Sequence, residues 1–347
     1  MLDLSRLERL ELTRRPPWQR IMGRLLGLNY RWLPGIEIVL EDEARIPDEP
    51  VLFAMNHTDR YNYFPFQYEI WQRYDRFTAT WVKGKYYEHP FMAWFMESML
   101  QLPTVSRGYL ITRDFLSVLG RTPTDQEYGL LRAVVDARAV GDEAALPTPP
   151  DVPEKLLRKA RNPLGMPFPL PPDRLDPATR GAGGDREPDY ADYVCALFRA
   201  MMKRFTGLNE RAVEIGLDLL VFPQGTRARR LLPGRVGLSQ MALHLKVPIV
   251  PVGCNGSDRV YPGASPVGKK GRIVYRIGEP IPYDALAPWH VEGGFEPFSA
   301  LAERDHAARF RGVADLVTDR IDGLLDPEYQ RAPDAGEDAA RGADRFL

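Results

Sequence analysis

Short apolar runs alternate with amphipathic segments along most of the chain. The runs are rich in β-branched and aromatic residues and have the length of buried strands. The expected strands span residues 35–41, 51–55, 77–82, 102–107, 217–222, 247–252 and 272–277. Apolar residues at helical spacing predict helices over residues 89–100, 190–215, 236–245 and 301–325. This alternation predicts an α/β fold, with a mixed, mostly parallel central sheet flanked by helices.

Two stretches interrupt the pattern. The run 247–252 contains two prolines, which places it at a sheet edge or at a sheet irregularity. Between about residues 115 and 189 the periodicity is lost, and residues 144–188 hold 11 of the 32 prolines. We expect an inserted segment there, helical near 128–139 and 154–160 and otherwise a loop or lid.

The chain divides into three parts on this basis. Residues 1–35 form an amphipathic N-terminal segment, residues 36–326 form the α/β domain, and residues 327–347 form a flexible tail. In the first part, residues 12–34 carry five arginines and no acidic residue, with tryptophan and aliphatic residues at helical spacing. That composition suits a helix lying in a membrane interface. The alternative is a helix packed on its own domain with solvated arginines, and Gly23 and Gly27 weaken a helix in either setting.

The net charge and the cysteine content limit the kinds of partner that we expect. Lys plus Arg is 46 and Asp plus Glu is 47, and a net charge of −1 predicts no general affinity for nucleic acid. Cys195 and Cys254 supply neither a disulfide framework nor a set of metal ligands, so we expect no metal and a reducing cytosol.

The N-terminus lacks the pattern of a signal peptide, and no apolar run reaches the ~18 to 20 residues of a spanning helix. The expected location is peripheral, at the cytoplasmic face of a membrane.

The histidine that follows the second strand is the first candidate for chemistry. His57 comes directly after the apolar run 51–55, where a strand passes into the next segment, and α/β folds place their sites at such strand ends. A histidine base needs a partner that fixes its tautomer. On a helix beginning at His57, Asn62 lies about one and a half turns on and can reach the ring. Asp59 is the nearest carboxylate. A lone histidine is more often structural than catalytic, so this position needs support from elsewhere in the chain.

A second candidate is the turn after the strand at 217–222. Gly225 permits close backbone approach and Arg227 offers a bidentate donor, which together suit a phosphate or a carboxylate. Arg229 and Arg230 extend the positive charge. The alternative is a surface turn with solvated arginines.

In this order, the motifs resemble those of the glycerolipid acyltransferases, the glycerol-3-phosphate and lysophosphatidic acid acyltransferase family. The similarity extends over residues 36–282, apart from the inserted segment. The matching blocks are Asn56-His57, Leu102-Pro-Thr-Val-Ser-Arg107 with Lys83 upstream, Phe222-Pro-Gln-Gly-Thr-Arg227 and Val247-Pro-Ile-Val-Pro-Val252. Arg113 competes with Arg107 for the arginine of the second block.

The resemblance implies an O-acyltransferase that needs no cofactor. His57 would act as general base on an acceptor hydroxyl, which attacks the thioester of acyl-CoA or acyl-carrier protein, with Asn62 and Asp59 assisting. The acceptor would be a glycerol phosphate or a lysophospholipid. The residues implied in substrate binding are Lys83, Arg107, Arg113, Gln224, Gly225, Thr226 and Arg227.

Two positions depart from the family pattern. Asn62 stands where the family has aspartate, and Gln224 stands where it has glutamate. Each change removes a negative charge and keeps the hydrogen-bonding shape, so an imidazolium at His57 would be stabilised less. This leaves open a non-catalytic protein that binds lipid or acyl-CoA on the same scaffold. Hydrolysis of a thioester by water activated at His57 is a third alternative.

Overall fold

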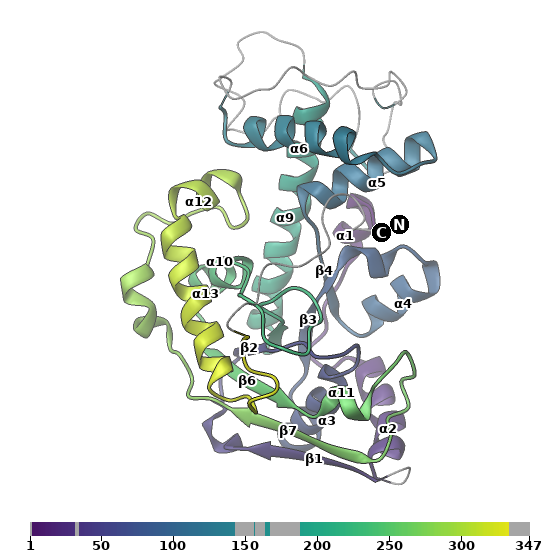
Figure 1. The fold of residues 1–347 in the computed structure, drawn as a ribbon, viewed down its shortest axis with the longest axis vertical. Helices are drawn as coiled ribbons and strands as arrows, with labels where there is room; N and C mark the ends of the chain where they lie inside the picture. Colours follow the sequence, from purple (N-terminus) through teal and green to yellow (C-terminus); the bar gives the residue numbers. More distant parts are fainter. Residues whose placement is uncertain (1, 32–34, 143–155, 157–163, 167–187, 333–347) are drawn as a thin grey trace.

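A seven-stranded sheet forms the centre of the computed structural model, which describes residues 2–31, 35–142, 156, 164–166 and 188–332. The strand order is β1-β7-β6-β2-β5-β3-β4 (Figure 1). The strands are β1 (Ile36–Glu41), β2 (Leu52–Met55), β3 (Thr78–Lys83), β4 (Gln101–Thr104), β5 (Asp218–Val221), β6 (Ile249–Asn255) and β7 (Gly271–Ile277). All neighbours pair in parallel except β6 and β7. The expected mixed, mostly parallel α/β fold is confirmed.

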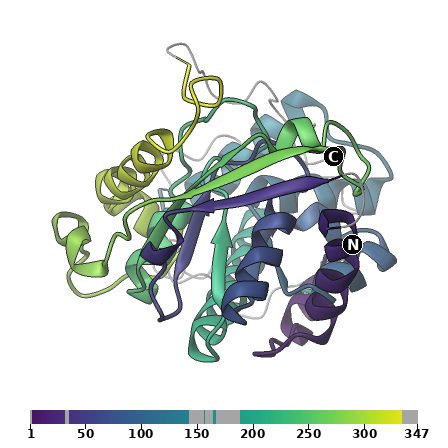
Figure 2. The ribbon, with the colours of Figure 1, turned by 90° about the horizontal axis from the view of Figure 1, so that it is seen from below.

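Helices cover both faces of the sheet (Figures 1 and 2). They are α1 (Leu4–Arg9), α2 (Pro17–Arg31), α3 (Tyr63–Tyr74), α4 (Pro90–Ser98), α5 (Arg107–Leu119), α6 (Asp125–Ala139), α9 (Tyr190–Glu214), α10 (Gly237–Leu245), α11 (Ser257–Val260), α12 (Ala300–Asp305) and α13 (Ala307–Asp322). Short 3-10 helices span Glu43–Arg45 (η1), Gly84–Tyr87 (η2) and Tyr283–Trp289 (η4). None of the helices in the described part of the chain is long and apolar enough to cross a membrane.

Alternation along the central strands divides the core in two. Leu52 and Ala54 of β2 join the larger apolar cluster, which contains residues of α5, α9, α10 and α13. Phe53 and Met55 point the other way and join the cluster that contains residues of α3 and β7. Because neighbouring residues of a strand face opposite sides, a continuous apolar run is what a strand buried on both faces requires.

β6 lies inside the sheet, between β2 and β7, which excludes the sheet edge, the first of the two alternatives expected for the run with two prolines. The irregularity is present instead. The regular pairing with β7 covers only Val252 to Asn255, and the Pro251 carbonyl accepts from the Gly278 amide where β7 has already ended. Pro251, which has no N–H to donate, therefore lies just outside the regular β6–β7 pairing.

Helices α5 and α6 occupy the start of the expected insertion. Phe115 lies inside α5, and α6 begins with a capping box between Thr124 and Glu127. Both helices pack against α9. The expected helix at 154–160 lies outside the described residues apart from position 156.

Two expectations for the C-terminal part are wrong. The helix predicted over 301–325 is two helices, α12 and α13, which meet at His306. The predicted tail begins too early, because Tyr329 is fully buried and its hydroxyl donates to Asp258. Residues 333–347 of that tail lie outside the described part.

Candidate functional site

The end of β2 is tied to its neighbour β6 by the side chain of Asn56. Its Nδ2 donates to the Cys254 carbonyl at 2.9 Å, and its Oδ1 accepts from the Cys254 amide at 2.7 Å. The two bonds use both ends of one buried amide. They fix the point at which the backbone leaves the sheet, and therefore the position of His57, which follows.

A turn connects His57 to α3, so the predicted helix start at His57 is wrong: α3 begins at Tyr63. The Asp59 carboxylate accepts from the Tyr61 amide at 2.8 Å, and the Phe64 amide bonds to the Tyr61 carbonyl at 2.9 Å. An aspartate that accepts from the amide two residues on favours a turn over a helix. The turn brings Asn62 back toward His57.

The contact between His57 and Asn62 is made. Nδ1 of His57 lies 2.9 Å from Oδ1 of Asn62, while Nδ2 of Asn62 donates to the Asn56 carbonyl at 2.8 Å. Because the Asn62 amide nitrogen faces a carbonyl, its oxygen must face the ring, and Nδ1 of His57 must carry the hydrogen. The basic lone pair of the neutral ring is therefore on Nε2.

The surroundings of His57 keep the ring neutral. Burial, together with the charges of Arg227 and Lys83, lowers its pKa to about 4, against the opposing effect of the hydrogen bond to Asn62. The ring stacks on Phe222, with centroids 4.0 Å apart and planes at 20°. At neutral pH the side chain is thus an uncharged base of fixed tautomer.

The Gln224 side chain hydrogen-bonds to the backbone of His57 and to the backbone of its own turn at Thr226. Its Oε1 accepts from the His57 amide at 3.3 Å, and its Nε2 donates to the carbonyls of Thr226 (2.9 Å) and His57 (3.4 Å). Its side chain is buried, so the structure gives it a positioning contact with His57 in place of the open position expected of a substrate-binding group. A glutamate could not make the two donations.

The rest of the second motif forms a tight turn beside the histidine. Gly225 has φ +66°, a left-handed conformation that favours glycine, and its amide bonds to the Phe222 carbonyl at 2.9 Å. Arg227 is exposed and Thr226 half-buried. Because Lys83 at the end of β3 also acts electrostatically on His57, two cations of the expected set lie around the ring. Such a site favours an anionic ligand group.

Asp59 is held in the turn. Besides the Tyr61 amide, its carboxylate accepts from the Thr58 hydroxyl at 2.9 Å, and burial raises its pKa. These bonds give Asp59 a role in shaping the loop, and they replace the direct assistance to the ring that the sequence suggested.

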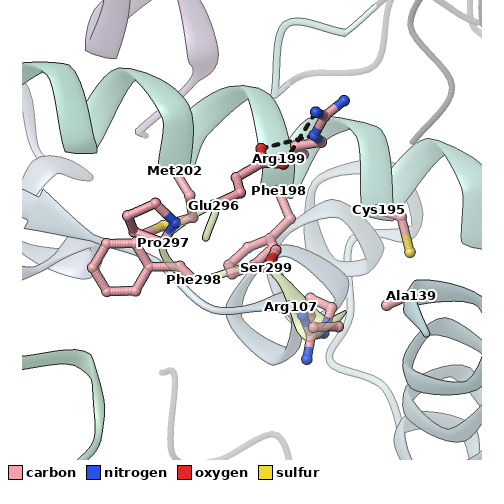
Figure 3. Close-up of a pocket in the computed structure, with 11 residues that line it drawn as sticks. Arg107, Ala139, Cys195, Phe198, Arg199, Met202, Glu296, Pro297, Phe298 and Ser299 are labelled. Carbon is pink, nitrogen blue, oxygen red and sulfur yellow. Dashed lines mark hydrogen bonds and ion pairs between the residues drawn. The ribbon is translucent and has the colours of Figure 1, made fainter. Parts of the chain in front are cut away.

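Arg107 is the first residue of α5, beyond the strand that was expected to end with it. Its guanidinium bonds to Asp136 of α6 at 2.9 Å, lies 3.7 Å from Glu303 of α12 and sits over the Phe198 ring. It lines a pocket between α9 and the segment 296–300, where Arg199 pairs with Glu296 (Figure 3). Two carboxylates therefore already neutralise this arginine.

Arg113, the competing arginine, is buried within α5 and pairs with Glu88. Neither Arg107 nor Arg113 has an electrostatic effect on the His57 ring comparable to those of Arg227 and Lys83. The structure thus brings His57, Asn62, Gln224, Arg227 and Lys83 together and engages both other arginines elsewhere.

Two supporting residues were missed by the sequence reasoning. The Tyr275 hydroxyl of β7 donates to the Asn62 carbonyl at 2.6 Å, and Phe222 supplies the surface on which the His57 ring lies. Phe222 was visible as the residue before the turn, but Tyr275 lies 213 positions from Asn62 and carries no local signal. Among the described residues, no group of three or more acidic, histidine or cysteine side chains is placed to hold a metal ion.

No protein-family model matches the sequence. No curated protein matches it either. Among solved structures, the chain is similar to the crystal structure of the 1-acyl-sn-glycerophosphate (LPA) acyltransferase, PlsC, from Thermotoga maritima, with 14% sequence identity and a TM-score of 0.37. The match covers 90% of this chain and 79% of that chain.

Proposed function

We propose that this protein transfers an acyl group from a thioester donor, acyl-CoA or acyl-carrier protein, to a hydroxyl of a glycerol-phosphate or lysophospholipid acceptor. One observation carries the proposal: His57 is a neutral base whose Nδ1–H is held by Asn62, which leaves Nε2 to accept a proton. The ordered motifs around Asn56-His57, the 222–227 turn and the 247–252 strand support the same reaction.

The reaction needs one proton acceptor at the strand end. Nε2 of His57 takes the proton of the acceptor hydroxyl as its oxygen attacks the thioester carbonyl carbon. The C–O bond forms, the C–S bond breaks, and the proton on Nε2 passes to the departing thiolate, so the histidine is regenerated. General-base help of this kind is worth roughly 10² to 10⁴-fold, and holding two substrates in place contributes several kcal/mol more.

Charge around the ring suits a phosphorylated acceptor. Arg227 and Lys83 both act on His57 electrostatically, so an anionic group bound between them would lie near the reacting hydroxyl. We assign the acceptor's phosphate to these two side chains. Arg107 is assigned to the packing of α5, α6 and α12, because Asp136 and Glu303 already neutralise it.

The test offers the purified full-length protein acyl-CoA with glycerol 3-phosphate, lysophosphatidate or monoacylglycerol, and follows thiol release and product mass. We expect an acylated product, lost about 10² to 10⁴-fold in His57→Gln. His244→Gln is the matched control, since His244 is a surface histidine bonded to Glu210. Unchanged turnover by His57→Gln contradicts the assignment, and free fatty acid formed without acceptor indicates a thioesterase.

A non-catalytic acyl-CoA- or lipid-binding protein is the second candidate. Asn62 favours it, because an amide stabilises the imidazolium of the reaction less than a carboxylate does. Saturable binding of acyl-CoA with no product after long incubation with every acceptor would establish this alternative.

A further inference from the structure

Large apolar side chains are exposed together on α2 and α4. Of the nine such side chains exposed in the described part of the chain, six belong to these two helices: Trp18, Ile21, Leu25, Leu28, Phe91 and Trp94. The two helices meet through their aromatic rings, because Trp18 and Trp94 lie 5.0 Å apart edge to face, and Phe91 lies 5.9 Å from Trp94. We call these six residues the α2–α4 surface.

α2 is fixed to the protein by its opposite face. A Cβ on Gly23 would lie 2.6 Å from the Trp71 ring, and one on Gly27 would lie 3.1 Å from Tyr68, so α3 packs directly on the glycines. The buried Gln19 side chain adds bonds to the Thr78 and Met99 carbonyls. The glycines that weaken the helix therefore provide its packing face.

The exposed residues of α2 form one stripe. Trp18, Ile21, Leu25 and Leu28 follow the spacing i, i+3, i+7, i+10, which places them along a single face of the helix. Leu25 and Leu28 are each more than half exposed, at 54% and 53%. A stripe of this kind, extended by a second helix, is larger than the scattered apolar residues that a soluble surface normally carries.

The positive charge of α2 indicates which kind of partner the α2–α4 surface would bind. Arg20 and Arg24 are exposed on the same helix as the stripe, and residues 12–34 include no acidic side chain. Tryptophan at the edge of an apolar face, with arginine beside it, matches the headgroup level of a bilayer that contains anionic lipid. A second copy of the chain fits less well, because a two-fold interface would bring the same arginines of both copies together.

We propose that the α2–α4 surface docks the protein on an anionic lipid bilayer, with its aromatic and aliphatic side chains in the interface and Arg20 and Arg24 against lipid phosphates. The surface combines two segments far apart in the sequence, so α4 is as much a part of it as residues 12–34. None of its six residues contacts His57 in the contacts described above, and its test needs no acyl donor. The outcome therefore does not depend on the proposed reaction.

Vesicle flotation with the full-length protein tests the proposal. Vesicles of phosphatidylcholine are compared with vesicles that also contain phosphatidylglycerol, at low and high salt. We expect binding to the anionic vesicles that weakens with salt, and binding at least about tenfold weaker in Arg20→Glu/Arg24→Glu. Trp18→Ser/Trp94→Ser should weaken it comparably through lost apolar insertion.

Matched controls lie away from the surface. Leu130→Ser removes an exposed apolar side chain from α6, which lies at the top of Figure 1, whereas α2 lies near the bottom and α4 at the right. Lys203→Glu/Arg320→Glu reverses two exposed charges, on α9 and α13. Both should bind as the unmodified protein does. Absence of vesicle binding overturns the proposal, as does equal binding by the surface variants. A dimer that Trp18→Ser/Trp94→Ser dissociates, without vesicle binding, would assign the surface to a second copy.

Discussion

Nδ1 of His57 lies 2.9 Å from Oδ1 of Asn62, and the orientation of that amide is set by its other end, which donates to the Asn56 carbonyl. The Asn62 side-chain amide therefore has two roles. It holds the histidine tautomer, and it satisfies a carbonyl where β2 leaves the sheet. A carboxylate could perform the first task only, because it has no N–H to offer.

Asn62→Asp should therefore destabilise the protein without raising its rate. The Asn56 carbonyl would lose its donor and face a buried negative charge, a change worth about 1 to 3 kcal/mol or more. Urea unfolding of both forms at pH 7 measures this, and initial rates of acyl transfer measure the second part. Repeating the substitution in a His57→Gln background separates the effect on Asn56 from the effect on the ring. A faster enzyme of unchanged stability would contradict the prediction.

The pH dependence of the reaction should be displaced toward acid. Burial, with Arg227 and Lys83, lowers the pKa of His57 to about 4, so the ring stays a base through the range where a free histidine with pKa ~6.5 would be protonated. We expect kcat/KM to fall only as the pH drops through about 4. Between pH 6.5 and 4 the stability should also decrease as the pH falls, because the unfolded chain takes up the proton first.

Arg227→Gln should move that titration toward higher pH, because it removes one of the charges that oppose protonation of His57. Titrating the His57 ring proton by NMR measures the change even where activity is low. Arg309→Gln, at an exposed position on α13, is the control and should leave the titration unchanged. A His57 that titrates near 6.5 in the unmodified protein would show that the ring is not held as described.

Gln224→Glu should destabilise the turn increasingly as the pH rises. The new carboxylate would face the carbonyls of His57 and Thr226, to which Gln224 now donates, so its folded-state pKa would be raised. Stability relative to the unmodified protein is then lost as the pH rises above the unfolded value of ~4.3, by about 1 to 3 kcal/mol at pH 7. Urea unfolding at pH 4 and pH 7 measures it. Gln72→Glu, at an exposed position, should show no such loss.

The sequence predicted the sheet well because its central strands are buried on both faces. Residues 51–55 are apolar at every position, and residues 217–222 are apolar at every position except Asp218, which pairs with Arg76. This pattern is visible in the sequence without tertiary information. Helix starts were predicted less well. The helix expected at His57 begins six residues later, since the Asp59 side chain takes the Tyr61 amide and closes a turn. Periodicity does not register a single side-chain bond of this kind.

Within the site, the sequence was sufficient to identify the local motifs, but not the residues from distant parts of the chain that contact them. Asn62 was expected beside His57 for a helical reason that is wrong, and a turn delivers it there instead. Arg107 looked open to an anion because its immediate neighbours are uncharged. Asp136 and Glu303, which neutralise it, come from helices 29 and 196 positions further along the chain. Such pairs depend on how helices pack, which a single sequence does not display.

Removing the Arg107 side chain should accordingly affect stability more than substrate binding. Arg107→Ala removes the cation that joins Asp136 of α6 to Glu303 of α12, although Asp136 keeps its ion pair with Arg132. We expect a lower midpoint of thermal unfolding, with little change in the KM for glycerol 3-phosphate relative to monoacylglycerol. Arg227→Ala should do the reverse. It should raise the KM for the phosphorylated acceptor alone, by about tenfold or more, with a small change in stability. If Arg107→Ala instead raised the KM for glycerol 3-phosphate alone, Arg107 would be the residue that binds the acceptor's phosphate.

Two helical glycines provide the sharpest test of how α2 is held. An alanine is worth up to ~1 kcal/mol more than glycine inside a helix, so both substitutions would stabilise if helix propensity decided the outcome. At Gly129 of α6 nothing lies within 4 Å of the added carbon, and Gly129→Ala should gain that amount. At Gly23 the carbon would meet the Trp71 ring at 2.6 Å, so Gly23→Ala should instead cost about 1 to 3 kcal/mol in urea unfolding. Equal stabilisation at both sites would mean that α2 does not pack on α3 through its glycines, and the exposed stripe opposite them would lose its fixed orientation.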